Sequence, residues 1–422
     1  MLKKLSQIFS SPDLRNKILV SLFIVVIARF LAHIPMPGVN TEELKNFFSR
    51  NQIFGFLNMF SGGAMENFSL IMMGVGPFIT ASIIFQLLQM IVPSIEALSK
   101  EGERGRQKIN QWTRYAAVPL AIIQAFGTTA LLKNQGVITN LSGLPFITML
   151  ISVTAGTMLL MYLGEILSEK GIGNGMSIII AVGILSGYPM NIRNTAAVIG
   201  TDKALGLILF IAILVVVIAL IVIMNEGVRQ IPISYARRTR GTKSYGGVDT
   251  YLPLRVNTGG VVPIIFALSF MLFPGIIAKF FTAARSPWLS DMAFKVSAFF
   301  SNNTYYGIIY FIATIIFTYF YASIIFKPTE VAENLQKQGG FIPGIRPGTE
   351  TASFLAKVLN RITFVGALFL GFIAVLPFIV QSLTQINTIV IGGTGMLIIV
   401  SVIIETSRQI KAQLLMRTYD TY

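Results

Sequence analysis

Ten apolar segments alternate with polar segments along the chain. They are Lys17–His33, Ser69–Val92, Tyr115–Leu132, Leu144–Leu163, Ile172–Met190, Ala204–Met224, Gly260–Phe281, Thr304–Phe326, Ile362–Gln381 and Ile391–Ile404. About 20 apolar residues in a helix cross the ~30 Å hydrocarbon core of a bilayer. The pattern therefore predicts an all-α polytopic membrane protein with ten transmembrane helices.

The second apolar segment has features that a helix facing lipid avoids. Residues that weaken a helix occupy its first third and polar residues follow them: Gly74, Gly76, Pro77, Thr80, Ser82, Gln86 and Gln89. The apolar run before it, Ile53–Phe60, is too short to cross and leads into a flexible Ser61-Gly62-Gly63 joint. Weakened backbone at membrane depth is tolerated where protein buries it or where it lines a water-filled path. Two interpretations remain open: a re-entrant element, and the more common interfacial loop before a kinked core helix.

A short repeat links the second and seventh apolar segments. Gly74-Val75-Gly76-Pro77-Phe78-Ile79 is echoed by Gly260-Val261-Val262-Pro263-Ile264-Ile265. The two stretches hold the same position in successive five-helix halves. Because five is odd, the halves must have opposite topology, as in inverted-repeat transporters whose working site lies between the halves. We expect an N-terminal half over residues 1–190 and a C-terminal half over residues 191–422.

Composition and charge support the membrane assignment and set the topology. The 422 residues are 54% hydrophobic and 12% charged, against about 25% charged in soluble domains. With a cytoplasmic N-terminus, 24 of the 33 Lys and Arg residues fall in segments on the inside and 8 fall outside. This bias predicts that both termini are cytoplasmic. We expect no cleavable signal peptide, and the absence of cysteine excludes disulfides.

Two of the inside segments are longer than a connection requires. They cover residues 225–258 and 327–357 and together carry ten Lys and Arg residues. Long loops of this kind often carry function, although solvated positive-inside loops account for most such charges.

Residues for chemistry inside the membrane are scarce. The ten spans contain no Asp or Glu except near their ends, which disfavours proton- or sodium-coupled carriers. Arg29 is the charged residue plainly within a span, and we expect it to snorkel to the outer face or to pair locally. The single histidine, His33, cannot build a metal site or a Ser–His pair, and no protease, lipase or ATPase motif occurs. We predict no catalytic residue, no metal and no cofactor, so that a partner or a gradient must drive any work.

Six stretches resemble the bacterial SecY family, the pore subunits of the protein-secretion translocon. The resemblance runs from about Leu14 to Arg417 and is carried by residues 69–89, 101–115, 164–180, 259–275, 341–351 and 392–405. It implies ten helices in two inverted halves around a central pore, and a channel that passes unfolded preproteins across the membrane. It also implies that apolar segments leave sideways into lipid between helices 2 and 7.

The resemblance assigns roles to particular residues. An apolar pore ring falls on Val75, Ile79, Met176, Ile180, Ile265 and Ile398. A plug falls on about 54–67 and includes Phe56, Leu57, Met59, Phe60, Gly62 and Gly63. The lateral gate takes in Pro77, Thr80, Ser82, Gln86 and Pro263. Docking of a motor or ribosome falls on Arg237, Arg238, Lys243 and Arg346, with Thr242 standing where relatives often have a second basic residue.

The implied partners are the small membrane subunits SecE and SecG, the motor ATPase SecA, the ribosome, signal peptides and preproteins, and membrane lipids. The implied location is the inner (cytoplasmic) membrane of the cell. A facilitative small-solute transporter is the main alternative and predicts a polar site at mid-membrane with no large docking loops. An intramembrane hydrolase is a third possibility, but it needs a constellation of residues that the sequence lacks.

Overall fold

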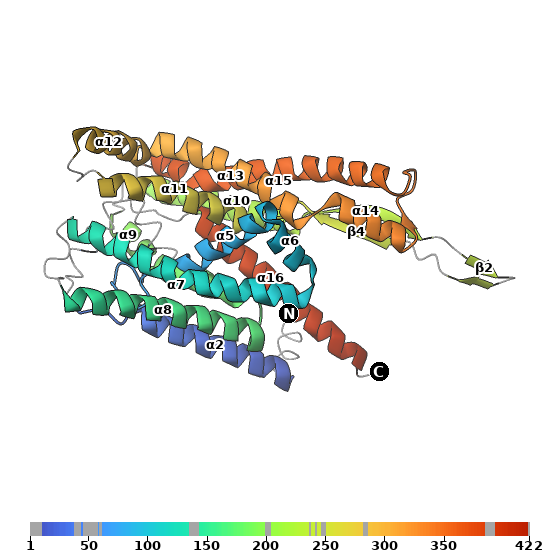
Figure 1. Ribbon diagram of the computed structural model, residues 1–422, viewed down its shortest axis with the longest axis horizontal. Coiled ribbons are helices and arrows are strands. Elements are labelled where there is room, and N and C mark those ends of the chain that lie inside the picture. Colours follow the sequence, from blue (N-terminus) through green and yellow to red (C-terminus); the bar gives the residue numbers. More distant parts are fainter. Residues whose placement is uncertain are drawn as a thin grey trace. The chain divides into compact units, whose positions relative to one another are not determined.

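The chain is mainly helical (Figure 1). The computed structural model describes residues 11–37, 44, 58, 61–134, 143–198, 204–235, 238–240, 243–245, 250–281, 286–384 and 393–420. The helices are α2 (Pro12–Ala32), α5 (Gly76–Ile91), α6 (Pro93–Lys100), α7 (Glu103–Asn134), α8 (Leu144–Lys170), α9 (Gly175–Val198), α10 (Ala204–Glu226), α11 (Val262–Phe281), α12 (Pro287–Ser301), α13 (Asn303–Ile325), α14 (Pro328–Lys337), α15 (Thr349–Thr384) and α16 (Gly393–Asp420).

A helix lies in each of the ten apolar segments, and several helices extend beyond the apolar stretch. Within the described ranges, three helical stretches are by themselves long and apolar enough to cross a membrane: Leu144–Lys170, Thr304–Lys337 and Thr349–Val380. Helices α5 and α6 form a fourth candidate together, although they are bent by 101° at Val92. The bend lies just before Pro93, since a residue before proline avoids helical backbone angles.

The chain forms two compact units. One contains Met1–Leu205, Leu272–Asn302 and Gln385–Tyr422, and the other contains Gly206–Met271 and Asn303–Thr384. In the first unit α5 packs on α7, α7 on α8, and α8 on α9, while α2 lies along α8 and α16 packs on α9 (Figure 1). Small residues allow close approach at one of these contacts, where Ala81 and Ala117 are fully buried beside Met161.

In the second unit α13 packs along α15, and the two long segments that were predicted to be cytoplasmic loops fold together. Strand β1 (Val228–Tyr235) pairs antiparallel with β4 (Thr250–Arg255) and with β5 (Gly340–Phe341), in the order β4-β1-β5. Buried Ile231 and Ile233 alternate with exposed Pro232 along β1, as a half-buried strand requires. A second hairpin pairs β2 (Arg238–Arg240) with β3 (Lys243–Tyr245).

The sheet has a hydrophobic core of its own. It consists of Ile231, Leu254, Ile342 and Leu355, with apolar residues of α14 and the start of α15 packed around it. We call β1, β4, β5, α14 and the first turns of α15 the cytoplasmic module, after the side of the membrane that the charge bias predicts for it.

Candidate functional site

The second apolar segment is broken as its sequence indicates, but its helix begins later than predicted. Residues 61–75 form consecutive turns and α5 starts at Gly76, so a continuous helix from Ser69 is wrong. The reason is local, because Gly74 adopts a φ of 56° and Pro77 has no N–H to continue a helix backward. At ~1.5 Å per residue the 16 residues of α5 span about 24 Å, less than a hydrocarbon core.

The non-helical stretch is buried in protein. Phe68 and Met72 are fully buried and pack with Met65, Met149 and Val153. Backbone hydrogen bonds tie the stretch to the chain after α2, from the Met36 N–H to the Phe68 carbonyl (2.9 Å) and from the Leu70 N–H to the Ile34 carbonyl (3.3 Å). This burial favours a re-entrant element over an interfacial loop, since irregular backbone at membrane depth needs protein around it.

The sequence repeat is also a structural repeat. Gly260 has a φ of 61°, close to the 56° of Gly74, and α11 begins two residues later, as α5 does after Gly74. The first hydrogen bonds correspond as well, from the Ile79 N–H to the Val75 carbonyl (3.0 Å) and from the Ile265 N–H to the Val261 carbonyl (3.3 Å). Helices α5 and α11 therefore start with the same backbone geometry, a glycine with positive φ two residues before the first helical residue.

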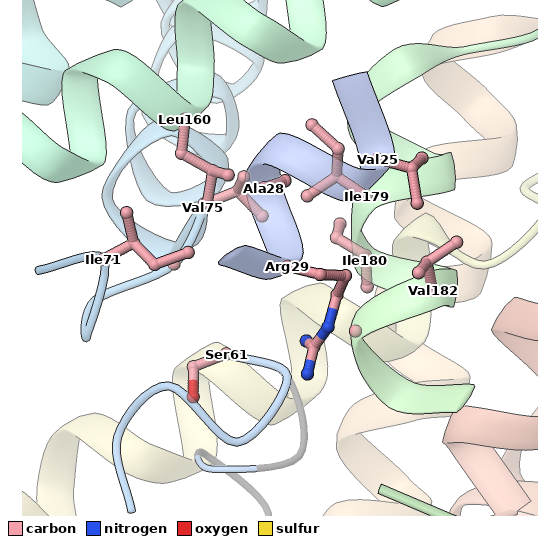
Figure 2. A pocket seen from close by; sticks show the side chains of 12 residues that line it. Val25, Ala28, Arg29, Ser61, Ile71, Val75, Leu160, Ile179, Ile180 and Val182 are labelled. Atoms are coloured by element: carbon pink, nitrogen blue, oxygen red, sulfur yellow. The ribbon is translucent and has the colours of Figure 1, made fainter. Parts of the chain in front are cut away.

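A hollow in the first unit lies beside the start of α5 (Figure 2). Most of its lining is aliphatic and comes from α2, the 61–75 stretch, α8 and α9, with Leu160, Val75 and Ile180 among the residues. Val75 and Ile180 are 4% and 6% exposed, so both predicted ring residues face the interior of the unit. One charged side chain, Arg29, also lines the hollow.

The other four predicted ring residues are not among the residues that line this hollow. Ile398 is buried on α16, which packs on α9. Ile79 is half-buried, and half-buried Met176 packs against the Ala81–Ala117–Met161 cluster. Ile265 is half-buried on α11 in the second unit. The structure thus brings Val75 and Ile180 to one hollow, and a ring of six stays a prediction.

Arg29 forms its hydrogen bond with a residue that is distant in the sequence, and its snorkelling to the outer face stays a prediction. Its Nη1 donates a hydrogen bond of 2.8 Å to the carbonyl oxygen of Gly62, 33 residues along the chain. In Figure 2 the Arg29 side chain extends from α2 toward the turn that carries Ser61. Its charge within an apolar span singled out Arg29 in the sequence, but the sequence did not show that Gly62 is its partner.

Four of the predicted plug residues, Phe56, Leu57, Met59 and Phe60, lie outside the described residues. Gly62 and Gly63 are described, and their φ angles of 68° and 79° place both in the left-handed region that glycine adopts without strain. We call residues Ser61–Asn67 the hinge turn.

The hinge turn is held by hydrogen bonds, most of them to Asn58, and is not the loose joint that its sequence indicates. The Glu66 N–H donates to Asn58 Oδ1 (2.9 Å), and Asn58 Nδ2 donates to Glu66 Oε2 (2.8 Å). Ser61 Oγ donates to the Asn58 carbonyl (2.9 Å) and accepts from the Met65 N–H (3.2 Å).

The polar residues of the predicted gate, Thr80, Ser82 and Gln86, are half-buried and hydrogen-bonded. Thr80 Oγ1 donates to the Gly76 carbonyl (3.0 Å) and accepts from Gln124 Nε2 of α7 (3.3 Å). Gln86 Nε2 donates to Ser82 Oγ (3.3 Å), and Gln86 Oε1 is buried with no hydrogen-bond partner in the described part of the chain. Pro77 and Pro263 are both buried near the starts of their helices. Thr80 therefore faces α7 of its own unit, a partner that the sequence did not reveal.

Arg346 is exposed on the cytoplasmic module, at the turn between β5 and α15. The turn is ordered on both sides: the Ile345 N–H donates to the carbonyl of buried Ile342 (3.0 Å), and Thr351 Oγ1 donates to the Arg346 carbonyl (2.8 Å). Arg238 and Lys243 stand on the β2–β3 hairpin, where the structure describes their backbone, and Arg237 lies outside the described residues. No group of three acidic or histidine side chains in the described ranges could hold a metal ion.

Comparison with known proteins gives one consistent result. The SecY family model matches residues 69–407. A protein translocase subunit SecY from Halalkalibacterium halodurans is 42% identical over 434 residues, covering 100% of both chains. A solved structure described as a protein conducting channel aligns with a TM-score of 0.62 at 19% identity, over 94% of this chain and 92% of that one. Sec61 in a canine ribosome-channel complex aligns with a TM-score of 0.61 at 18% identity, again over 94% and 92%. At these identities the structural matches show the fold, which confirms the predicted polytopic helical class.

Proposed function

The chain belongs to the SecY family, and from this premise we propose that it is the protein-conducting channel of a translocon. It passes unfolded preproteins across the inner membrane and is a channel subunit, not an enzyme. The observation that carries this conclusion is the 42% identity to a SecY translocase subunit over the full length of both chains. The transporter and hydrolase alternatives are not retained.

The hollow at the start of α5 has the chemistry that such a channel needs. Aliphatic side chains have no hydrogen-bonding pattern, so a constriction made from them tolerates any passing side chain, and it can dewet to block ions. Val75 supplies one such group from the turn before α5, and Ile180 supplies another from α9. In our proposal Ile79, Met176, Ile265 and Ile398 complete the ring.

The lateral exit lies, in our proposal, between α5 and α11. Their matching starts at Gly76 and Val262 support equivalent roles in two inverted halves. The buried Gln86 Oε1, which lacks a partner in the described ranges, supports a polar contact between α5 and a group from outside those ranges or from another chain. This seam releases apolar segments to lipid.

The cytoplasmic module is the proposed docking site for SecA and the ribosome. Its sheet joins both basic segments into one folded surface, and an ordered turn holds the backbone from which the exposed Arg346 side chain projects. A guanidinium can make bidentate contacts with carboxylate or phosphate. The similarity to a Sec61 chain from a ribosome complex is compatible with this role. SecE and SecG are the proposed membrane partners, and both termini are cytoplasmic.

Reconstitution tests the function. Proteoliposomes containing the chain with SecE and SecG, supplied with SecA and ATP, should make a preprotein resistant to external protease. Vesicles without the chain, and complete vesicles without ATP, are the controls. Equal protection with and without the chain would contradict the proposal.

A further inference from the structure

Arg29 connects the first transmembrane helix to the hinge turn. It stands in the last turn of α2, and its guanidinium donates to the Gly62 carbonyl at 2.8 Å. The side chain is half-buried among aliphatic neighbours, and among the described residues it forms no ion pair. A cation retained in such a place marks a function more often than a packing need.

The same point of the hinge turn also touches α9. A Cβ at Gly62 would lie 2.7 Å from the Gly183 Cα and 2.8 Å from Arg29 Nη1. A Cβ at Gly183 would lie 3.1 Å from the Gly62 Cα. Gly62 is therefore clamped between the guanidinium of α2 and the backbone of α9, one turn beyond Ile180.

The two ends of the hinge turn are attached differently. At Phe68 and Leu70 the chain is fixed by the backbone hydrogen bonds to Met36 and Ile34. At Gly62 the attachment is one charge-assisted hydrogen bond and one glycine–glycine contact. Met65, farther along the turn, is buried in the core with Met149 and Val153. Loss of the Gly62 contact therefore frees the Gly62 end of the turn to pivot about Met65 and Phe68, which stay anchored.

We propose that Arg29 is a positioning residue that latches the hinge turn against α9 and so keeps the resting channel sealed. This inference rests on the proposed channel function and adds a residue to it. Arrival of a preprotein in the hollow displaces the turn, and the latch re-forms when the channel empties. Arg29 acts on the closed state, so the conductance of a channel held open by substrate does not depend on it.

Resting ion conductance in planar bilayers tests the latch. Arg29→Met keeps the aliphatic stem and removes the donors, and we expect the resting conductance to rise about tenfold or more. Gly183→Ala brings a Cβ to 3.1 Å from the Gly62 Cα, so that the turn must shift by a few tenths of an ångström while Arg29 is unchanged, and this variant should also leak. Arg29→Lys keeps a cationic donor and should restore most of the seal. Arg114→Met is the matched control, because Arg114 pairs with Glu165 between α7 and α8 of the same unit and should leave the seal intact.

Two further measurements separate a latch from a general structural role. Conductance with an arrested preprotein in the pore, and the rate of export of a preprotein with an intact signal sequence, should match the wild type in every variant. A tight seal in Arg29→Met, or a leak that Arg29→Lys does not reduce, overturns the proposal. If Arg29→Met fails to insert, a tight seal in Gly183→Ala overturns it. Failure of the wild-type channel to export any preprotein would instead refute the underlying function.

Discussion

Ile180 shows what a single buried side chain contributes to a channel. It is 6% exposed and lines the hollow together with Val75. Ile180→Asn places an amide among aliphatic groups, which hydrates the constriction and destabilises the closed state by about 1–3 kcal/mol. We expect the variant to export preproteins with defective signal sequences, measured as the processed fraction.

Two controls accompany this variant. Ile180→Val should cost about 0.5–1.5 kcal/mol and keep signal selection intact. Ile151→Asn changes an exposed position of α8 and should not relax selection. Normal rejection of defective signals by Ile180→Asn would remove Ile180 from the ring.

Arg346 provides a residue-scale test of docking. The hydrogen bonds of Thr351 and Ile345 order the backbone of its turn, so the exposed side chain projects from a defined point of the module. Arg346→Glu should abolish SecA-driven export while the protein still inserts, and Arg346→Lys should be impaired because an ammonium cannot bind bidentately. ATP-dependent export into vesicles measures both.

Lys337 is the matched control on the same module. It is exposed and lies 3.9 Å from Glu333, a surface pair that contributes little to stability. Lys337→Glu should export at nearly the wild-type rate. Normal export by Arg346→Glu would move the docking contact elsewhere.

At the scale of single residues, the resemblance to the SecY family selected Val75 and Ile180 as ring residues, and the structure places both at one hollow. It could not identify the partner of Arg29, because a backbone carbonyl 33 residues away has no side-chain signature. Gln124 was missed for a similar reason: its contact with Thr80 depends on how α5 and α7 pack.

At the scale of elements, α5 and α11 should form a seam that opens. Cysteine pairs test this well because the chain has no cysteine of its own. Ser82→Cys on α5, combined in turn with cysteines at positions 265–270 of α11, should yield at least one pair that oxidises, since a disulfide requires Cα atoms within about 7 Å. Oxidation should block export and reduction should restore it. If no pair crosslinks, the two helices are not adjacent.

The plug segment provides a second element-scale test. Deleting residues 55–64 removes Gly62, the acceptor of Arg29, along with the apolar run before it. The channel should still fold, because the pivot at Phe68 and its bonds to Met36 remain, but it should conduct ions at rest. An unchanged resting conductance in planar bilayers would count against a plug in this segment.

Element boundaries show where sequence reasoning succeeds and fails. Glycine and proline in the second span predicted its weakness, yet not that the helix would begin at Gly76, because the φ of Gly74 follows from burial against α8 and α7. The sequence predicted loops for the two long polar segments. It could not reveal the sheet, because β5 has only two residues and pairs with β1 across more than a hundred positions.

At the scale of the whole molecule, the apolar segments alone predicted a helix at each of ten places. The repeat around Gly74 and Gly260 predicted equivalent elements, and both helices begin with the same backbone geometry. Division of the chain into halves at residue 190 stays a prediction, as does the ring that would lie between them.

A preprotein should pass through the aliphatic hollow on its way across the membrane. Site-specific crosslinking between the channel and an arrested preprotein is the direct test of this path. A single Ile180→Cys channel should form a disulfide with a cysteine placed in the arrested segment, whereas a single Ile151→Cys channel, with its cysteine on the exposed face of α8, should not. Crosslinking at position 180 that depends on SecA and ATP is the result we predict. No crosslink at position 180 in an exporting channel, or equal crosslinking at position 151, would contradict the account.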